Sequence, residues 1–403
     1  MRVTTGMIFD SGVSSMQKQN ARLLETQQQA SSSRRVLRPS DDPVASARAL
    51  EVSQSKGVNA LYTANQGYAT DALRLVDSKL GAANDILTYV RTRAVESGNG
   101  AYSKSDQAAI AADLTQQFEA LQSVANSQDA AGDYVFGGYR SNSQPFTGGL
   151  LGGVSYQGDQ GARTLQISAS RNLPITSSGD EIFNNIRAAS GSAFALSASS
   201  NAGTGQVSGM TLSSYNNHDY KIQVSNAVPG PGLAYTAFDT TAGGAGVAVT
   251  PGLSATGETT LTFGGGGVTL TLSGAPAAGD HFTVSTVANT FDVLGNFVQA
   301  LNSGVATATR FGSAQAIAGM DAAQESVSVV RSGVGSRMVE VDTQQNINSN
   351  LDVQYTDTLS RLEGSDAASL VSIISNLTQQ KTYLEAAQQS FMKVSNLSLF
   401  NYL

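Results

Sequence analysis

Cysteine and tryptophan are absent from this chain of 403 residues, and charged residues make up only 14% of it. Without cysteine the chain can form neither a disulfide framework nor a thiolate metal site. The net charge of −7 argues against general binding to nucleic acids or acidic membranes, because contacts with phosphate need a basic surface. The length allows two or three domains, and their surfaces must consist largely of neutral polar side chains.

Long apolar runs are missing as well. The opening stretch MRVTTGMIFDSG lacks the continuous apolar core of a secretory signal peptide. No stretch offers about 18 apolar residues in succession, so we expect no membrane span. If the protein leaves the cell, we expect a route that needs no cleaved signal.

Histidine is scarce, and the familiar catalytic motifs do not occur. His218 and His281 are the only two histidines, and neither belongs to the two-histidine helix motif of zinc enzymes. There is no G-x-S-x-G nucleophile elbow. Gly264 to Gly267 lack the Gly-Lys-Ser/Thr sequence that a phosphate-binding loop needs. We therefore expect no catalytic residue, no metal and no cofactor.

Two stretches with a helical period flank a region without one. Before about residue 140, and again after Asn289, apolar side chains recur at spacings of three and four. This alternation is typical of a coiled-coil seam. The clearest positions are Leu73, Val76, Leu80, Ala83, Leu87, Val90 and Ala94 in the first stretch, and Met320, Ala323, Val327, Val330 and Val334 in the second.

The region between them has the signature of β structure. Residues 188–279 are rich in glycine, serine and threonine, and no ten of them in a row keep a helical period. Apolar and polar residues alternate over 261–263 and 268–272, on either side of four glycines, which predicts two strands joined by a turn. VSYQGD (154–159), TLQIS (164–168) and HFTVST (281–286) are further strand candidates.

These patterns predict an α+β, multi-domain protein. We expect a long antiparallel helical bundle or coiled coil formed by both chain ends, with an inserted all-β outer domain. The expected domains are an N-terminal pairing arm (1–40), the first half of a helical domain (41–145), a β-rich inserted outer domain (146–289), the second half of the helical domain (290–365), and a C-terminal pairing helix (366–403) that pairs with the arm.

A charged stretch, RRVLRPSDDP, separates the first two predicted helices. Pro39 can end one helix, Asp42 suits the N-cap of the next, and Pro43 suits its first position. In that interpretation the arginines are ordinary surface charges. In the alternative, the stretch is an assembly contact at which the arginines meet carboxylates of neighbouring subunits. The spacing leaves both open for Arg34, Arg35, Arg38, Pro39, Ser40, Asp41, Asp42 and Pro43.

A resemblance favours the assembly contact. MRVTTGM, RRVLRPSDDPVASARALEV, YVFGGYRSNSQPF, GDEIF and the closing SDAASLVSIISNLTQQKTYLEAAQQSFMKVSNLSLFNYL occur in this order. Together they resemble the flagellar hook-associated protein 3 family, the hook–filament junction proteins of bacteria. The resemblance covers about 1–185 and 280–403, and 188–279 carries no motif of the family. One departure is Ser33, where the family commonly has glycine.

The resemblance implies a structural role without catalysis. Such a protein joins the hook to the flagellin filament by helical self-assembly of its terminal helices, in the extracellular flagellum. The implied partners are further copies of the chain in a tubular layer, hook-associated protein 1, flagellin, the flagellar type III export machinery and an export chaperone. Neither nucleic acid nor membrane is among them.

The resemblance also assigns residues to these contacts. Thin, glutamine-rich stripes at 9–30 and 370–398 bury too little apolar surface to order alone, so neighbouring copies are expected to cover them. The expected contacts of the terminal helices are Leu23, Leu24, Ile374, Leu377, Leu384, Phe391, Leu397 and Phe400. The chain is expected to leave the helical domain for the β domain at Phe136, Gly137, Gly138, Tyr139, Pro145 and Phe146.

Two alternatives stay open. Flagellin, the filament subunit, has similar ends and a β insert of variable size, although FGGYRSNSQPF and SLFNYL favour a junction protein. A surface-binding module would use the insert to bind glycans or matrix. Few aromatic residues there could stack on sugars, namely Tyr215, Tyr220, Tyr235, Phe238 and Phe263.

Overall fold

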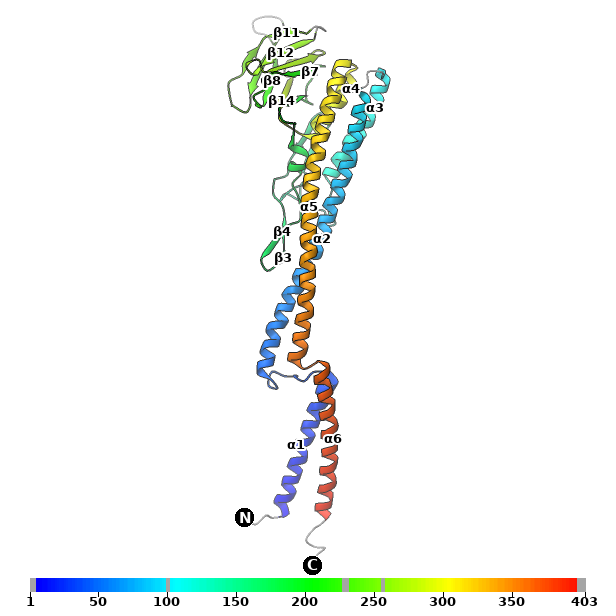
Figure 1. Ribbon diagram of the computed structural model, residues 1–403, viewed down its shortest axis with the longest axis vertical. Coiled ribbons are helices and arrows are strands. Elements are labelled where there is room, and N and C mark those ends of the chain that lie inside the picture. The colour runs from blue at the N-terminus through cyan, green and yellow to red at the C-terminus, as the bar shows by residue number, and fades with distance from the viewer. Residues whose placement is uncertain (1–4, 99–101, 227–231, 255–257, 397–403) are drawn as a thin grey trace, which may run out of the picture. The chain divides into compact units, whose positions relative to one another are not determined.

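The computed structural model describes residues 5–98, 102–226, 232–254 and 258–396 (Figure 1). The chain divides into two compact units, which we describe separately. The first combines Met1–Asn65 with Thr343–Leu403, and the second is Gln66–Asp342. Two long helices, α2 (Pro43–Ser97) and α5 (Ala306–Glu363), contribute residues to both units.

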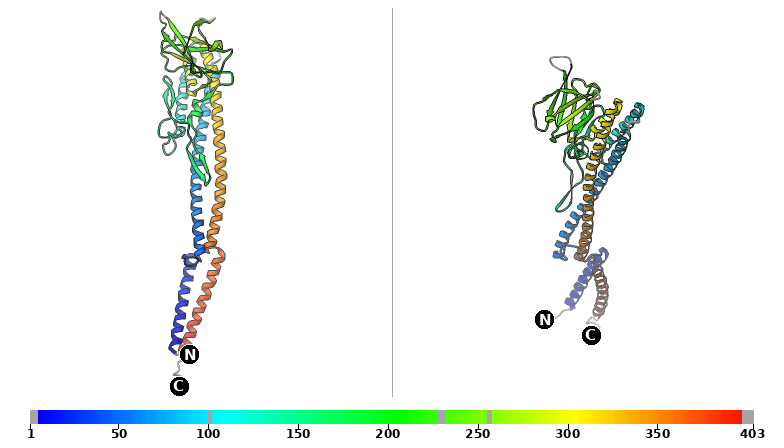
Figure 2. Two further views of the ribbon diagram at one scale, coloured as in Figure 1. Left: turned by 90° about the vertical axis from the view of Figure 1, so that its left-hand side faces the viewer. Right: turned by 45° about the horizontal axis from the view of Figure 1, so that its top comes forward.

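The first unit contains a pair of helices from the two ends of the chain. Helix α1 (Thr5–Ser32) and helix α6 (Ala367–Asn396) lie side by side (Figures 1 and 2). The rings of Phe9 and Phe391 are 5.1 Å apart, and Gly12 leaves room for the Phe391 ring. Thr26 donates a hydrogen bond of 2.9 Å to the side chain of Gln380. The contact between these helices is therefore partly polar.

The parts of α2 and α5 in the first unit also meet through polar groups. The Asn59 side-chain amide is buried and donates to the carbonyl oxygen of Asn348 at 2.9 Å. Lys56 donates to the Thr356 hydroxyl at 2.7 Å and lies 3.8 Å from the carboxylate of Asp352. This stretch of the helix pair therefore contains a buried amide layer in place of a continuous apolar seam.

The second unit holds the predicted coiled-coil seam, which is confirmed. Every residue of the series from Leu73 to Ala94 is at most 1% exposed, and the series from Met320 to Val334 is buried as well. Two shorter helices, α3 (Lys104–Ala125) and α4 (Thr290–Ser303), pack together beside this seam. A capping box of Ser103 and Asp106 begins α3.

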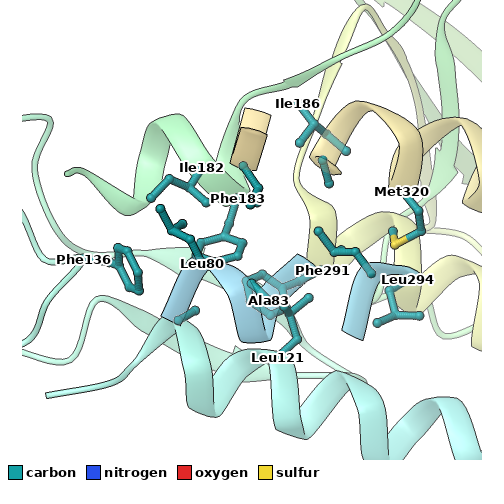
Figure 3. Packing of buried hydrophobic residues seen from close by; sticks show 14 of the residues in the cluster. Leu80, Ala83, Leu121, Phe136, Ile182, Phe183, Ile186, Phe291, Leu294 and Met320 are labelled. Atoms are coloured by element: carbon teal, nitrogen blue, oxygen red, sulfur yellow. The ribbon is translucent and has the colours of Figure 1, made fainter. Parts of the chain in front are cut away.

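Aromatic rings fill the centre of this unit. Figure 3 shows Leu80 and Ala83 of α2, Leu121 of α3 and Phe291 of α4 close to Phe183. Phe183 belongs to a short π-helix, η1 (Asp180–Asn184), which comes from the motif GDEIF. Its ring meets those of Phe146 and Phe291 at centroid distances of 5.6 and 6.0 Å.

Three small antiparallel ladders connect the helices to the β domain. They pair β1 (Phe146–Gly149) with β2 (Gly153–Tyr156), β3 (Thr164–Ser168) with β4 (Arg171–Pro174), and β5 (Ile186–Arg187) with β15 (Val287–Ala288). The strands expected from VSYQGD and TLQIS are thereby confirmed as β2 and β3, and their partners β1 and β4 are additional strands.

The β domain is a two-sheet sandwich. One sheet is five-stranded, in the order β10-β9-β8-β14-β6, and the other is four-stranded, in the order β11-β12-β13-β7. Ile222 and Phe282 of the first sheet share one buried cluster with Leu261 and Leu270 of the second. The strands are β6 (Phe194–Ser197), β7 (Gln206–Leu212), β8 (Tyr220–Asn226), β9 (Leu233–Asp239), β10 (Val247–Val249), β11 (Pro251–Leu253), β12 (Thr259–Phe263), β13 (Val268–Ser273) and β14 (His281–Ser285).

The sandwich confirms two further predictions. A glycine turn, η2 (Gly264–Gly266), joins β12 to β13, and Gly265 adopts the left-handed conformation there with φ 66°. The expected strand HFTVST is β14, which lies inside the five-stranded sheet. The α+β, multi-domain fold is confirmed, whereas the domain boundaries stay predictions. Among the described residues, none of the helices combines the length and the hydropathy that a membrane span requires.

Burial of one carboxyl group generates the first testable prediction. Asp292 lies in the first turn of α4, and desolvation raises its pKa to about 6 from an ordinary value of 3.8. A carboxyl with a raised folded-state pKa stabilises the folded state at low pH, and this contribution is lost as the pH rises through about 6. Asp292→Asn should therefore raise the unfolding free energy by roughly 2–3 kcal/mol at alkaline pH, measured by urea unfolding.

The same comparison at acidic pH is the control. Below the ordinary carboxyl pKa, both the parent and the variant carry a neutral group at position 292, and their stabilities should converge. An equal gain at both pH values would contradict the explanation by burial.

Candidate assembly site

The connection between α1 and α2 is folded onto the turn between α5 and α6. The backbone N–H of Arg35 donates to the carbonyl oxygens of Glu363 at 3.0 Å and Gly364 at 3.3 Å, and the N–H of Val36 donates to Glu363 at 3.1 Å. The guanidinium of Arg34 lies 3.1 Å from the Glu363 carboxylate. This charged stretch is thus an intramolecular joint that ties both ends of the chain together.

Two backbone positions allow this joint. Gly364 has φ 65°, and a Cβ atom there would overlap the Cβ of Arg35. Ser33 directly follows α1 and has φ 56°, a left-handed conformation that glycine adopts more easily. The departure from the family pattern at Ser33 therefore falls at a position where a side chain is strained.

The two aspartates of the joint hold backbone groups. Asp41 accepts hydrogen bonds from the N–H groups of Leu37 at 3.0 Å and Arg38 at 2.8 Å. Asp42 accepts one from the N–H of Ala45 at 3.0 Å, so the prediction that it caps a helix beginning at Pro43 is confirmed. Both carboxyl groups have a lowered pKa. The largest cause is the hydrogen bond from the backbone N–H of Arg38 for Asp41, and that from the backbone N–H of Ala45 for Asp42.

The arginines of the joint differ in their contacts. Arg35 donates to the Asp42 carboxylate at 3.3 Å, and Arg34 pairs with Glu363. Arg38 forms no ion pair within the described residues, and Pro39 and Ser40 beside it are exposed. Arg38 therefore differs from Arg34 and Arg35, whose guanidinium groups both lie beside a carboxylate.

The terminal-helix residues fall into different environments. Leu384 is buried between α1 and α6, and Phe391 packs against Phe9, so both contribute to the helix pair itself. Leu24 and Ile374 are both 58% exposed. Leu23 and Leu377 are half-buried, and Leu397 and Phe400 lie outside the described residues.

Other exposed apolar residues on the terminal helices were not anticipated. They lie beside the apolar stripes of the two helices. These residues are Met7, Val371, Tyr383 and Met392, all more than half exposed.

The motif FGGYRSNSQPF forms a compact turn at the edge of the aromatic core. The side chains of Phe136 and Phe146 are fully buried. The hydroxyl of Tyr156 donates toward the carbonyl oxygens of Phe136 at 3.0 Å and Asp159 at 2.8 Å. The carbonyl oxygen of Pro145 accepts from the N–H of Gln157 at 2.7 Å. The motif therefore packs on the segment that follows β2.

The glycines of this motif are required by close approach. Gly138 has φ 71°, and a Cβ atom there would overlap the carboxylate of Asp159. That carboxylate accepts from the N–H groups of Tyr139 at 2.9 Å and Gly161 at 2.8 Å. A Cβ atom on Gly137 would lie 2.8 Å from the carbonyl oxygen of Arg140.

The two histidines lie at separate places in the β domain. The Nδ1 atom of His218 lies 2.6 Å from the Asp239 carboxylate, whereas His281 lines a cleft that does not include His218. Among the described residues, no group of three or more histidines and carboxylates is placed to hold a metal ion. Tyr220, Tyr235 and Phe263 are buried inside the sandwich, which leaves Tyr215 and Phe238 half-buried as candidates for stacking on a sugar.

The first part of the chain matches a known protein family. Residues 3–141 match the bacterial flagellin N-terminal helical region. Flagellar hook-associated protein 3 of Salmonella typhimurium is 33% identical over 189 residues, and that of Escherichia coli is 31% identical over the same length. Each match covers 46% of this chain and 58% of the relative, so the matched region spans little more than half of these proteins.

Solved structures extend the likeness. FlgL of Xanthomonas campestris has 25% sequence identity and a TM-score of 0.53, covering 77% of this chain and 99% of that one. Hook-associated protein 3 of Legionella pneumophila is 24% identical with a TM-score of 0.55, covering 78% and 99%, which shows a shared fold. The first part of the chain is therefore similar to the flagellin N-terminal region. In sequence and in fold the chain is similar to hook-associated protein 3, so the resemblance expected from the sequence is confirmed.

The aspartate pair of the joint yields a second prediction. Asp41→Ala with Asp42→Ala should lower the melting temperature and the helix content at neutral pH, because three backbone N–H groups lose their acceptors. Folding lowers both pKa values, so the stability that the pair adds is present above the ordinary value of 3.8 and is lost on further acidification. Circular dichroism over a pH series checks both points.

Ser40→Ala is the matched control for this pair, because Ser40 is exposed and its hydroxyl meets only Asp41. It should melt like the parent. Normal swimming of cells that carry the double alanine variant would show that the pair is a helix cap without a role in assembly.

The turn at the glycine pair yields a third prediction. Gly138→Ala combines a left-handed backbone with an overlap, whereas Gly132→Ala changes a glycine with φ 87° that has open space around it. Gly132→Ala should cost roughly 1 kcal/mol, and Gly138→Ala about 1–3 kcal/mol more. Urea unfolding of both variants measures the difference, and equal losses would contradict the role given to Asp159.

Proposed function

We propose that this chain is a structural subunit of the hook–filament junction of the bacterial flagellum. The observation that carries the proposal is the apolar surface left open on the paired terminal helices, taken together with the relationship to hook-associated protein 3. In this role the chain catalyses nothing. It acts outside the cell, where it connects the hook to the flagellin filament.

The helix pair is poorly covered when one copy stands alone. Apolar side chains on the outer faces of α1 and α6 lose contact with water only when another helix packs on them. Leu24 and Ile374 are the two predicted contact residues in this position. Neighbouring copies in a tubular layer supply the missing helices, and burial of these side chains then drives assembly.

The joint gives the helix pair a fixed connection to the rest of the chain. Hydrogen bonds from the backbone of Arg35 and Val36 hold the α1–α2 connection against the α5–α6 turn. Arg38, which is free of an ion pair in the described part of one copy, pairs with a carboxylate of the next copy.

The partners follow from the place in the flagellum. One end of the layer contacts hook-associated protein 1, and the other contacts flagellin. The chain reaches this position through the flagellar type III export machinery, and an export chaperone binds α6 before export. The relationship to hook-associated protein 3 supports the junction over the alternative of a filament subunit.

A clean gene deletion tests the proposal most directly. The surface is viewed by electron microscopy, and flagellin in the medium is assayed. Hooks without filaments, accompanied by shed flagellin, are expected, because filament subunits are exported but find no base. Hooks without shed flagellin would identify the chain as the flagellin itself, and normal filaments would refute both functions.

A point substitution separates assembly from stability, and it is the fourth prediction. Ile374→Asp places a charge on the exposed face of α6 and should abolish filament attachment while the melting temperature of the purified chain stays unchanged. Ser375→Asp, on an exposed neighbouring position, should assemble normally. Leu384→Ala should instead lower the melting temperature, because its side chain is buried between α1 and α6.

A further inference from the structure

A polar cleft of about 480 Å³ lies in the second unit. Glycines of the β1–β2 hairpin line one part of it, and the segment from Leu196 to Ser200 lines another. His281 and Thr283 of β14 and Asp292 of α4 complete the lining. None of the residues given a role in assembly lines this cleft, so the proposed junction function leaves it without a purpose.

The cleft contains a carboxyl group without a counter-charge. Among the described residues that line it, Asp292 has the only carboxylate, and its side chain is half-buried. No charged group affects its pKa there, which desolvation raises to about 6 against a smaller opposing effect of the Val154 N–H. A buried carboxylate that has no cation beside it reduces stability unless a ligand compensates its charge.

A glycine leaves this carboxylate open to the cleft. A Cβ atom on Gly153 would lie 3.6 Å from Oδ1 of Asp292 and 3.3 Å from Oγ of Ser199, so both oxygens border the space that this glycine leaves empty. Gly153 has φ 76°, a conformation that disfavours any side chain. The backbone of the hairpin therefore keeps two neighbouring hydrogen-bond acceptors accessible.

The rest of the lining consists of hydroxyl groups and a few aliphatic side chains. Ser197 is 2% exposed, and its hydroxyl has no hydrogen-bond partner among the described residues. The side chains of Val154 and Leu196 add apolar surface. A ligand with both hydrogen-bond donors and an aliphatic part fits this mixture. The remaining hydroxyl groups belong to Thr147, Ser155, Ser200 and Thr283.

The charge of the cleft favours a cationic ligand. His281 is the basic residue in the lining, and burial lowers its pKa below the ordinary value of 6.5. The charge of Lys221 on β8 lowers this pKa further, and that of Asp280 opposes the change. At neutral pH the imidazole is therefore uncharged, and Asp292 gives the lining a single negative charge that repels anions and attracts cations.

We propose that this cleft binds a primary alkylammonium group, with its nitrogen between Asp292 and Ser199. An ammonium group has three N–H donors and no acceptor, which matches a carboxylate surrounded by hydroxyl oxygens. The aliphatic stem of the ligand contacts Val154 and Leu196. This binding goes beyond the junction function and does not depend on it. The ammonium group can come from a free amine or from a lysine side chain of another protein.

Calorimetric titration of the purified full chain tests the site. The probes are putrescine, as a free diamine, and Nα-acetyl-lysine N-methylamide, as a lysine side chain. Butanediol lacks the charge and tetramethylammonium lacks the N–H donors, so both should bind at least roughly ten-fold more weakly than the amines. Tighter binding of the lysine analogue would identify a protein as the source of the ammonium group, and tighter binding of putrescine a free amine.

Substitutions locate the binding on the chain. Asp292→Asn should weaken binding of both amines by roughly ten-fold or more, because it removes the negative charge of the cleft. Asp85→Asn makes the same change at an exposed position outside the cleft and should bind like the parent. Ser199→Ala should weaken binding several-fold while the melting temperature stays unchanged. Equal affinities of the parent and Asp292→Asn would overturn the proposal.

The pH dependence of binding distinguishes this role from a structural one. The carboxyl group of Asp292 has a pKa of about 6 and the amines stay charged, so the affinity should fall about ten-fold from about pH 7.5 to 5. Protonation of His281 acts in the same direction, because it adds a positive charge to the lining. Asp292→Asn should lose most of this dependence.

Two results would contradict the site. One is an affinity of the parent chain that does not change over this pH range, and the other is a lack of saturable binding for both amines. Either result leaves the junction function intact. Normal filaments after gene deletion would refute the junction function and leave the amine site standing.

Discussion

The apolar seam between α2 and α5 is the constraint on which the second unit depends. Leucine, valine and alanine alternate along α2 from Leu73 to Ala94 and meet a matching series on α5. Two exposed ion pairs also join these helices, Arg91 with Asp321 at 2.5 Å and Arg331 with Asp77 at 2.9 Å. Segments far apart in sequence are thereby held together, and the aromatic core, η1 and the β ladders are built against that frame.

The first unit follows a different principle. Its helices meet through few apolar side chains, a buried amide pair and a threonine–glutamine hydrogen bond. Buried polar groups add less stability than apolar packing does, although they restrict which partners and registers fit. A unit of this kind gains most of its order when further helices cover it, which agrees with the role proposed for the terminal helices in assembly.

Glycine and aspartate shape the connections between these parts. At the joint, two aspartates accept hydrogen bonds from backbone N–H groups, and Gly364 lets the α5–α6 turn approach the α1–α2 connection closely. At the motif FGGYR, the carboxylate of Asp159 fills the space that a side chain on Gly138 would occupy. Both motifs by which the chain resembles its relatives therefore serve first to fold a single copy, and contacts between copies would be built on these fixed turns.

The amino-acid sequence by itself determined the helical seams, the helix start at Asp42 and Pro43, the glycine hairpin of the sandwich and the α+β class, because these features depend on local periodicity and capping. Tertiary structure decided which stripe residues stay exposed, since Leu384 is buried by α1 whereas Ile374 on the same helix is not. It also decided that the aromatic residues of the insert are largely buried, and that the joint rests on Glu363 and Gly364. The helix pair and the joint depend on pairings across more than three hundred residues, and the burial of the aromatic residues depends on the packing of the two sheets. Local spacing carries no information about such contacts.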